Sequence, residues 1–75
     1  MEFDFSKLRG RIVEKFGTCA AFAAAMGFAD SALSARMNNK TPWDTLEIYS
    51  ACGLLSIPCE EIPVYFFVPK FEKTN

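Results

Sequence analysis

Three polar side chains recur at helical spacing after Gly27. Ser31, Ser34 and Asn38 are separated by three and four residues, and at about 100° per residue they lie on one face of a helix. The methyl group of Ala35 lies on the same side. Serine and asparagine can hydrogen-bond base edges in the major groove of DNA, and a methyl group can contact thymine. By itself such a face is ordinary solvated helix surface, and its place after Ala23 and Gly27 is what makes these four residues candidates for reading a double-stranded DNA sequence.

A second group of polar residues lies around this segment and is suited to holding phosphates. Thr18 precedes an alanine-rich stretch, and the beginning of a helix attracts anions. Arg36 lies on the flank of the face that carries Ser34, where its long side chain can extend toward the DNA backbone. Asn39 and Lys40 follow the same helix. If the chain binds DNA, the phosphate contacts would come from Thr18, Arg36, Asn39 and Lys40.

Residues that usually carry catalysis or bind metals are missing or unsuitably spaced. The chain has no histidine, which removes the commonest general base and metal ligand. Cys19, Cys52 and Cys59 show no Cys-x-x-Cys spacing, and we interpret them as small core residues. Glu60 and Glu61 are adjacent and would point in different directions on a helix. We predict no catalytic activity, no metal or other cofactor, and no small-molecule ligand.

Size and composition favour one globular domain, residues 1–75. A chain of 75 residues is too short for several hydrophobic cores, and its 51% hydrophobic content is typical of a folded domain. No apolar run approaches a membrane span, so a cytoplasmic location is expected. The formal charge is +2 over residues 1–43 and −3 over residues 44–75, which suggests that the first half faces a polyanion.

Apolar periodicity and capping residues predict four helices. Thr18 is the expected N-cap of the second helix, and Asp44 with Glu47 has the spacing of a capping box before the fourth. Gly53 is expected near the end of that fourth helix. The helices are expected at about residues 6–16, 19–26, 30–38 and 45–52. The apolar set of the fourth is Ile48, Cys52 and Leu55, supplemented by Leu46 and Tyr49.

The last part of the chain has conflicting signals. Pro58 suits the first turn of a helix, whereas Pro63 cannot lie deep inside one, so a short helix or single turn is expected near residues 59–62. Residues 64–68 are rich in β-branched and aromatic side chains, and an edge strand competes with helix there. We therefore expect residues 64–75 to form an arm that either folds back on the helices or contacts a second copy in a dimer.

The stretch from Thr18 to Lys40 resembles the helix-turn-helix of the Cro and phage-repressor family. Ala23 stands where the two helices approach closely, and Gly27 can take the positive φ that the turn requires. The packed positions of the motif are Phe22, Met26, Phe28 and Leu33. The Phe-Gly-Thr before it, the Asn-Asn-Lys-Thr-Pro-Trp after it and the late Tyr-Phe-Phe extend the resemblance to small prophage regulators over nearly the whole chain.

Two positions depart from the pattern of that family. Its third helix usually has an apolar residue where this chain has Arg36, and here Met37 supplies the inward side chain instead. Many members cap the recognition helix with serine or threonine where this chain has Ala29. Either Ala29 or Asp30 therefore begins the helix, and capping by Asp30, at the edge of the DNA contact surface, would shift the start by one residue.

The resemblance implies an all-α domain, a compact bundle of about five short helices, that binds double-stranded operator DNA and represses transcription sterically. A homodimer would suit an operator of two half-sites. The main alternative is an antirepressor-like protein-interaction module on the same scaffold, because the chain is slightly acidic and the recognition face lacks a central arginine, lysine or glutamine. An electropositive third helix would favour DNA, whereas a neutral one with an exposed apolar stripe would favour a protein partner.

Overall fold

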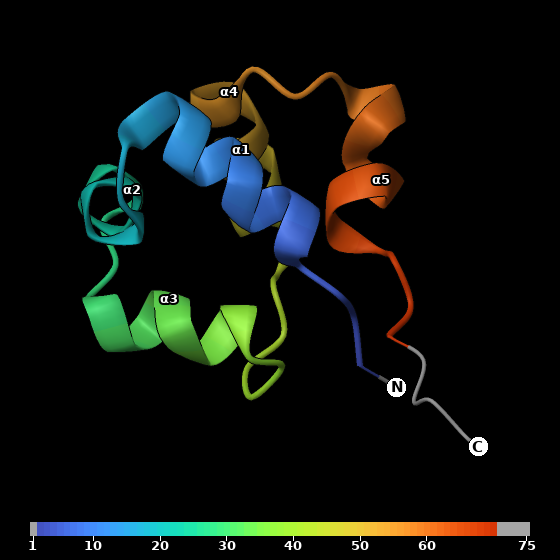
Figure 1. The fold of residues 1–75 in the computed structure, drawn as a ribbon, viewed down its shortest axis with the longest axis horizontal. Coiled ribbons are helices and arrows are strands. Elements are labelled where there is room, and N and C mark those ends of the chain that lie inside the picture. The colour runs from blue at the N-terminus through green and yellow to red at the C-terminus, as the bar shows by residue number, and fades with distance from the viewer. Residues whose placement is uncertain (1, 71–75) are drawn as a thin grey trace.

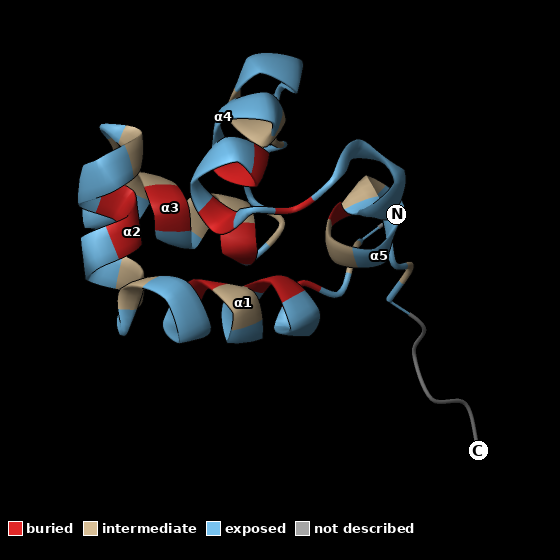
Figure 2. Ribbon diagram, turned by 90° about the horizontal axis from the view of Figure 1, so that it is seen from above, coloured by how far each residue is buried: buried red, intermediate tan, exposed pale blue. Residues whose placement is uncertain are grey.

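Short-range sequence signals place the helices, and the tertiary structure joins them in a bundle. The computed structural model describes residues 2–70. Its elements are α1 (Ser6–Phe16), α2 (Cys19–Met26), α3 (Asp30–Met37), α4 (Thr45–Leu55), the 3₁₀ helix η1 (Cys59–Glu61) and α5 (Ile62–Phe66). Figures 1 and 2 show α2 and α3 toward one end of α1 and α5 toward the other. The predicted all-α class is confirmed.

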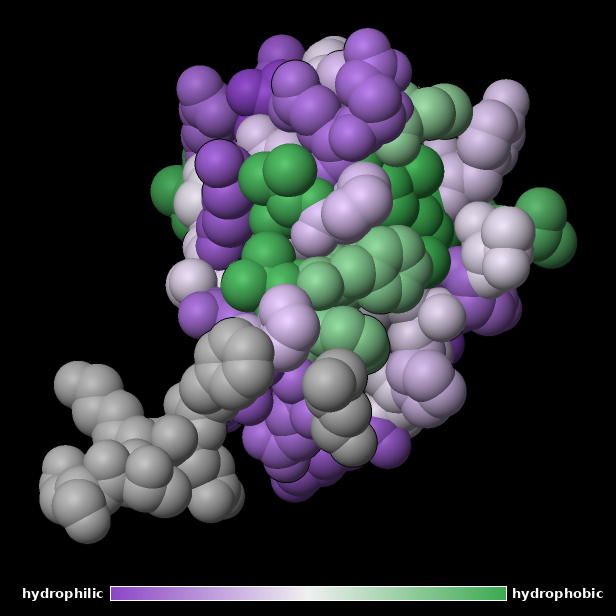
Figure 3. Space-filling model, turned by 90° about the vertical axis from the view of Figure 1, so that its right-hand side faces the viewer, coloured by the Kyte–Doolittle hydropathy of each residue, from purple (hydrophilic) through white to green (hydrophobic). Residues whose placement is uncertain are grey.

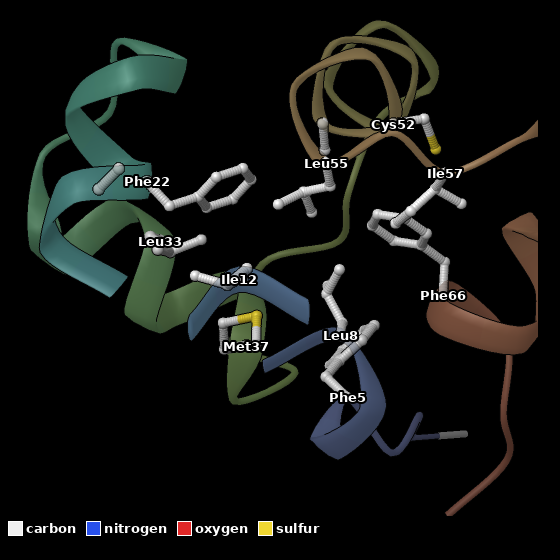
Figure 4. Packing of buried hydrophobic residues seen from close by; sticks show 12 residues of the cluster. Phe5, Leu8, Ile12, Phe22, Leu33, Met37, Cys52, Leu55, Ile57 and Phe66 are labelled. Carbon is white, nitrogen blue, oxygen red and sulfur yellow. The ribbon is translucent and has the colours of Figure 1, made fainter. Parts of the chain in front are cut away.

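Each α-helix contributes to one hydrophobic core. In Figure 2 the buried residues line the inner sides of the helices, while the outer sides are exposed. Figure 4 shows side chains from all five helices converging on the space between them. The buried set includes Leu8, Ile12, Phe22, Leu33, Leu55 and Phe66. Because Leu8 and Ile12 lie four residues apart, they face the core together, as the amphipathic pattern of the first helix predicts.

The turn between α2 and α3 has the geometry that Ala23 and Gly27 predict. Ala23 is fully buried, and Gly27 has a φ of +78° in the left-handed region. The N–H of Phe28 donates to the carbonyl oxygen of Ala23 at 2.8 Å. A small side chain and a flexible residue are therefore both required where the chain reverses direction.

The helix α4 starts as expected but extends further than expected. The Asp44 carboxylate accepts the N–H of Glu47 at 2.8 Å, and the Glu47 carboxylate accepts the N–H of Asp44 at 3.1 Å. The predicted capping box is thereby confirmed. The helix passes through Gly53 and ends at Leu55, so the expected end near Gly53 was wrong. Burial of Leu55 outweighs the cost of a helical glycine, which is about 1 kcal/mol.

The competition between strand and helix after Pro58 is resolved in favour of helix. Ile62 and Phe66 lie four residues apart in α5, and Phe66 is only 1% exposed. Its ring packs edge-on against Trp43, with 5.2 Å between ring centres. Pro63 lies in the first turn of α5, where its missing N–H breaks no helical hydrogen bond. Packing of Phe66 in the core thus favours helix over strand in this segment.

Within residues 64–70, the strand-like character expected of the C-terminal arm is limited to one bridge. Phe3 and Pro69 form an isolated antiparallel bridge, and the N–H of Asp4 donates to the carbonyl oxygen of Val68 at 2.7 Å. These contacts join the two ends of the described chain. The part of the expected arm from residue 71 onward lies outside the described residues.

The cysteines differ in burial. Cys52 lies in the core, and burial raises the pKa of its thiol. Cys19 is half-buried, whereas Cys59 is exposed, so the interpretation of all three as core residues was wrong for Cys59. Within residues 2–70, no three potential ligands among His, Cys, Asp and Glu gather as a metal site. No helix in that range is long and apolar enough to cross a membrane.

Replacing Ala23 with leucine should force α2 and α3 apart, because the site has no room for a larger side chain. We expect a loss of about 1–3 kcal/mol in the free energy of unfolding, measured by urea denaturation with the fluorescence of Trp43. Ala24→Leu, at an exposed position of the same helix, is the matched control and should change stability by less than about 0.5 kcal/mol. Equal losses in both variants would contradict the close approach at Ala23.

Candidate functional site

The outward side of α3 presents small neutral polar groups. Ser31, Ser34 and Asn38 are exposed, while Leu33 and Met37 face the core. The side-chain amide of Asn38 donates to the carbonyl oxygen of Ser34 at 2.8 Å and to its hydroxyl at 3.2 Å. These bonds hold Asn38 against the last turn of its own helix. The face is therefore accessible and polar, and none of these three side chains carries a charge.

The beginnings of α2 and α3 differ in their capping. Thr18 caps α2 as predicted, with its hydroxyl oxygen accepting the N–H of Ala21 at 3.1 Å. That hydroxyl can still donate its own hydrogen to an anion. Ala29 is the N-cap of α3, without a side-chain cap, and Asp30 is the exposed first helical residue. Of the two alternatives for the start of α3, the structure has Ala29 as the N-cap and no shift to Asp30, whose carboxylate lies where the helix dipole favours negative charge.

Arg36 is held within the protein. Its Nε donates to Oε1 of Glu47 at 2.8 Å and its Nη2 to Oε2 at 2.7 Å, which makes a bidentate pair between α3 and α4. Its Nη1 donates to the carbonyl oxygen of Ala32 at 2.9 Å, and the guanidinium lies 4.5 Å from the centre of the Phe28 ring. Arg36 thus has a tertiary role and does not extend into solvent as the expected phosphate contact requires.

The ion pair changes the titration of both partners. The Arg36 guanidinium, chiefly through its hydrogen bonds, holds the pKa of Glu47 below its usual range, and Glu47 raises the pKa of Arg36. The two side chains are only 16% and 17% exposed, so solvent and salt screen the pair less than a surface pair. At neutral pH the two charges cancel, and Arg36 adds no net positive charge to α3.

Asn39 fastens the N-terminal segment to the loop after α3. Its Oδ1 accepts the N–H of Phe3 at 2.8 Å, and its Nδ2 donates to the carbonyl oxygen of Phe3 at 2.9 Å. Its φ of +63° lies in the left-handed region, which asparagine tolerates better than most residues. Both ends of the amide are engaged, in contrast to the expected role in holding a phosphate. The two residues are 36 apart in the sequence, so patterns among neighbouring residues could not predict this contact.

The exposed charges at the two ends of α3 have opposite signs. Lys40 is exposed after the helix, and Asp30 is exposed at its start. Ala35 is half-buried, and its carbonyl oxygen accepts the N–H of Lys40 at 2.8 Å. On α1, Arg11 is also bound internally, because its Nε donates to the carbonyl oxygen of Leu55 at 2.9 Å. The side chains of α3 itself therefore carry little net charge, and the exposed Arg9 of α1 adds a positive charge beside Ser34 and Met37.

Exposed apolar side chains gather on α4 and α5. Leu46 and Tyr49 of α4 are 76% and 75% exposed, and Val64 and Phe67, in and just after α5, are 40% and 46% exposed. We call these four residues the α4–α5 surface. Figure 3 shows apolar residues across the middle of the face that carries α5. Leu46 and Tyr49 were expected to supplement the apolar side of the helix and instead lie outside the core.

Comparison with known proteins extends the similarity beyond α2 and α3. The family described as "Protein of unknown function (DUF739)" matches residues 1–69. No curated protein matches the chain. The solution structure of the modulator of repression (MOR) of the temperate bacteriophage TP901-1 from Lactococcus lactis is 42% identical, with a TM-score of 0.80 over 89% of this chain and 90% of that chain. The likeness thus covers nearly the whole domain.

Replacing Glu47 with glutamine should remove the charge of the pair and keep an oxygen that can accept the N–H of Asp44. We expect a loss of about 1.5–3 kcal/mol in the free energy of unfolding at neutral pH. Because the pKa of Glu47 is lowered in the folded protein, its stabilising effect is complete above the ordinary glutamate pKa. It is lost as the pH falls through the lowered value.

Urea denaturation of the native protein and of Glu47→Gln across the acid range measures this difference. Glu14→Gln is the matched control, because Glu14 pairs with Arg11 at 3.0 Å but is 65% exposed, and its loss should stay below about 1 kcal/mol. A stability difference for Glu47→Gln that stays constant from neutral pH into acid would contradict the role of the ionised carboxylate.

Proposed function

The chain belongs to the protein family of unknown function DUF739, and from that premise we propose that it is a phage-type regulatory protein that acts by binding a repressor protein. The relative described above is a modulator of repression, and it shares 42% of its sequence with this chain over nearly its full length. Repression can be modulated through the repressor protein itself, and a repressor is therefore the partner that we propose.

The observation that carries this proposal is the neutralisation of Arg36 by Glu47. Most of the affinity of proteins for DNA comes from lysine and arginine contacts with phosphates. Here the arginine of α3 is paired, and the exposed charges at the two ends of the helix, Asp30 and Lys40, have opposite signs. The exposed apolar side chains of the α4–α5 surface add the kind of contact on which protein interfaces depend.

Binding alone is sufficient for such a regulator to act. A partner that binds the repressor lowers or redirects the fraction of repressor that is free to occupy its operator, by mass action. No bond is made or broken, and no cofactor is needed. The direction of the effect depends on whether the bound repressor keeps its DNA-binding surface free.

The direct test is a calorimetric titration of the purified repressor from the same phage genome with this chain. We expect a complex that persists at moderate salt, and a changed affinity of the repressor for its operator when the chain is present. The chain alone should bind random duplex DNA weakly and lose that binding as salt is raised. No complex at concentrations of about 100 μM, or an unchanged operator affinity in the presence of the complex, would refute the proposal.

Sequence-specific DNA binding is a second candidate, favoured by the helix-turn-helix geometry of α2 and α3. Thr18 and the free N–H groups at the start of α2 suit a phosphate, and Lys40 suits another. Ser31, Ser34 and the methyl group of Ala35 would then face base edges, with Asn38 at the end of the helix. In this candidate function the chain would occupy an operator itself, as a repressor.

Selection of binding sites from a random duplex pool distinguishes the two candidates. Specific binding predicts an enriched site that the double variant Ser34→Ala, Asn38→Ala loses or relaxes. It also predicts that Lys40→Ala weakens binding to all duplexes similarly and lowers the salt dependence by about one ion. Failure to enrich any sequence would exclude this second candidate and leave the protein-binding function.

A further inference from the structure

An apolar groove runs between α4 and the segment formed by η1 and α5. It consists of two adjoining hollows of about 280 Å³ and 360 Å³, and Tyr49 and Ile62 line both. Ile48 and Phe67 also line the first hollow, and Gly53 and Pro58 also line the second. None of these six residues carries a charge. The groove is open to solvent and offers a long apolar surface along α4.

Acidic residues are next in sequence to residues that line this groove. Glu60 and Glu61 lie in η1 between Cys59 and Ile62, which both line the second hollow, and both glutamates are exposed. Asp44 is exposed at the N-terminal end of α4. Residues 44–69 contain four acidic residues and neither lysine nor arginine. The groove therefore combines an apolar floor with a negative border, and Glu47, the fourth acid of the segment, is neutralised by Arg36.

We propose that this groove binds a basic amphipathic helix of a protein partner. An amphipathic helix can place apolar side chains in a groove between two helices, at spacings of three, four and seven residues. Lysine and arginine on its flanks would meet Glu60, Glu61 and Asp44 across the border. This inference rests on the proposed function and names the contact surface and the chemistry of the partner.

Charge distinguishes this partner from a second copy of the chain. A two-fold dimer through the groove would bring the same surface of each protomer together. Glu60 and Glu61 would then face an equally acidic border, and like charges at an interface oppose association. A basic helix meets the same border with opposite charge.

The groove can be altered without unfolding the protein, because its most prominent side chain is exposed. Tyr49 is 75% exposed, so Tyr49→Ala removes contact area from the groove and little from the core. Glu60 and Glu61 have no charged partner within the described residues. Reversing both charges thus leaves the internal ion pairs intact. Urea denaturation of each variant checks that the fold is kept.

The probe is a synthetic amphipathic peptide of leucine and lysine at helical spacing, added to the full-length, isotope-labelled protein and followed by NMR. We expect chemical-shift changes at Tyr49, Gly53, Ile62 and Phe67. Tyr49→Ala, and separately the double variant Glu60→Lys, Glu61→Lys, should each weaken binding by about tenfold. The matched controls Val13→Ala and Glu14→Lys change an exposed apolar residue and an exposed acid of α1, and should leave the affinity unchanged.

Three results would overturn the inference. The first is equal binding of a peptide with glutamate in place of lysine, and the second is a set of shifts confined to α3. The third is self-association of the chain that Tyr49→Ala abolishes, which would assign the groove to a second copy.

The calorimetric titration with the repressor separates this inference from the proposed function. If the repressor binds Tyr49→Ala as well as the native chain, the groove inference fails and the proposed function stands. If the basic peptide binds in the groove but the repressor forms no complex, the proposed function fails and the groove inference is supported.

Discussion

One carboxylate, that of Glu47, links the helix that carries the candidate recognition face to the rest of the bundle. It accepts two hydrogen bonds from Arg36 of α3 and also the N–H of Asp44, which completes the cap of α4. The start of α4 and the attachment of α3 thus depend on the same group. Because the pair is largely shielded from water, removing one partner would leave the other charge poorly solvated.

The same ion pair sets the electrostatic character of the surface. In this small domain, three polar side chains with several hydrogen-bonding groups each hold parts of the tertiary structure together. Arg36 joins α3 to α4, Arg11 joins α1 to the end of α4, and Asn39 joins the loop after α3 to Phe3. The side chains left on α3 are small and neutral. The helix that follows the Gly27 turn therefore carries little of the positive charge on which DNA-binding domains depend.

Two large side chains of α4 lie outside the core. A chain of this length buries a limited share of its surface, and Leu46 and Tyr49 are 76% and 75% exposed. They lie on a helix whose other side packs well, with Ala51 and Leu55 fully buried. An apolar stripe on the outer side of a well-packed helix is typical of an interaction surface. The neutral face of α3 and this stripe both suit a protein partner.

The sequence by itself determined the elements that depend on neighbours a few residues away. The bounds of α1 and α2, the Thr18 cap, the turn at Gly27 and the Asp44–Glu47 capping box all follow from local hydrogen bonds and apolar spacing. The positions of Ser31, Ser34 and Asn38 on one exposed face follow from the same helical period. Their function in binding DNA or protein does not follow from that period, because the motif specifies a backbone geometry and not a charge.

Only the tertiary structure decided the features that depend on distant partners. Arg36 contacts Glu47, 11 residues away, and Asn39 contacts Phe3, 36 residues away. Patterns among neighbouring residues do not reveal such contacts, so both side chains were predicted from the sequence to bind phosphates. Burial of Phe66 turned a segment with strand propensity into α5, and burial of Leu55 carried α4 past Gly53. Local propensities differ by about 1 kcal/mol or less. Burying a large apolar side chain contributes about 1.5–3 kcal/mol, and long-range packing therefore prevails where the two conflict.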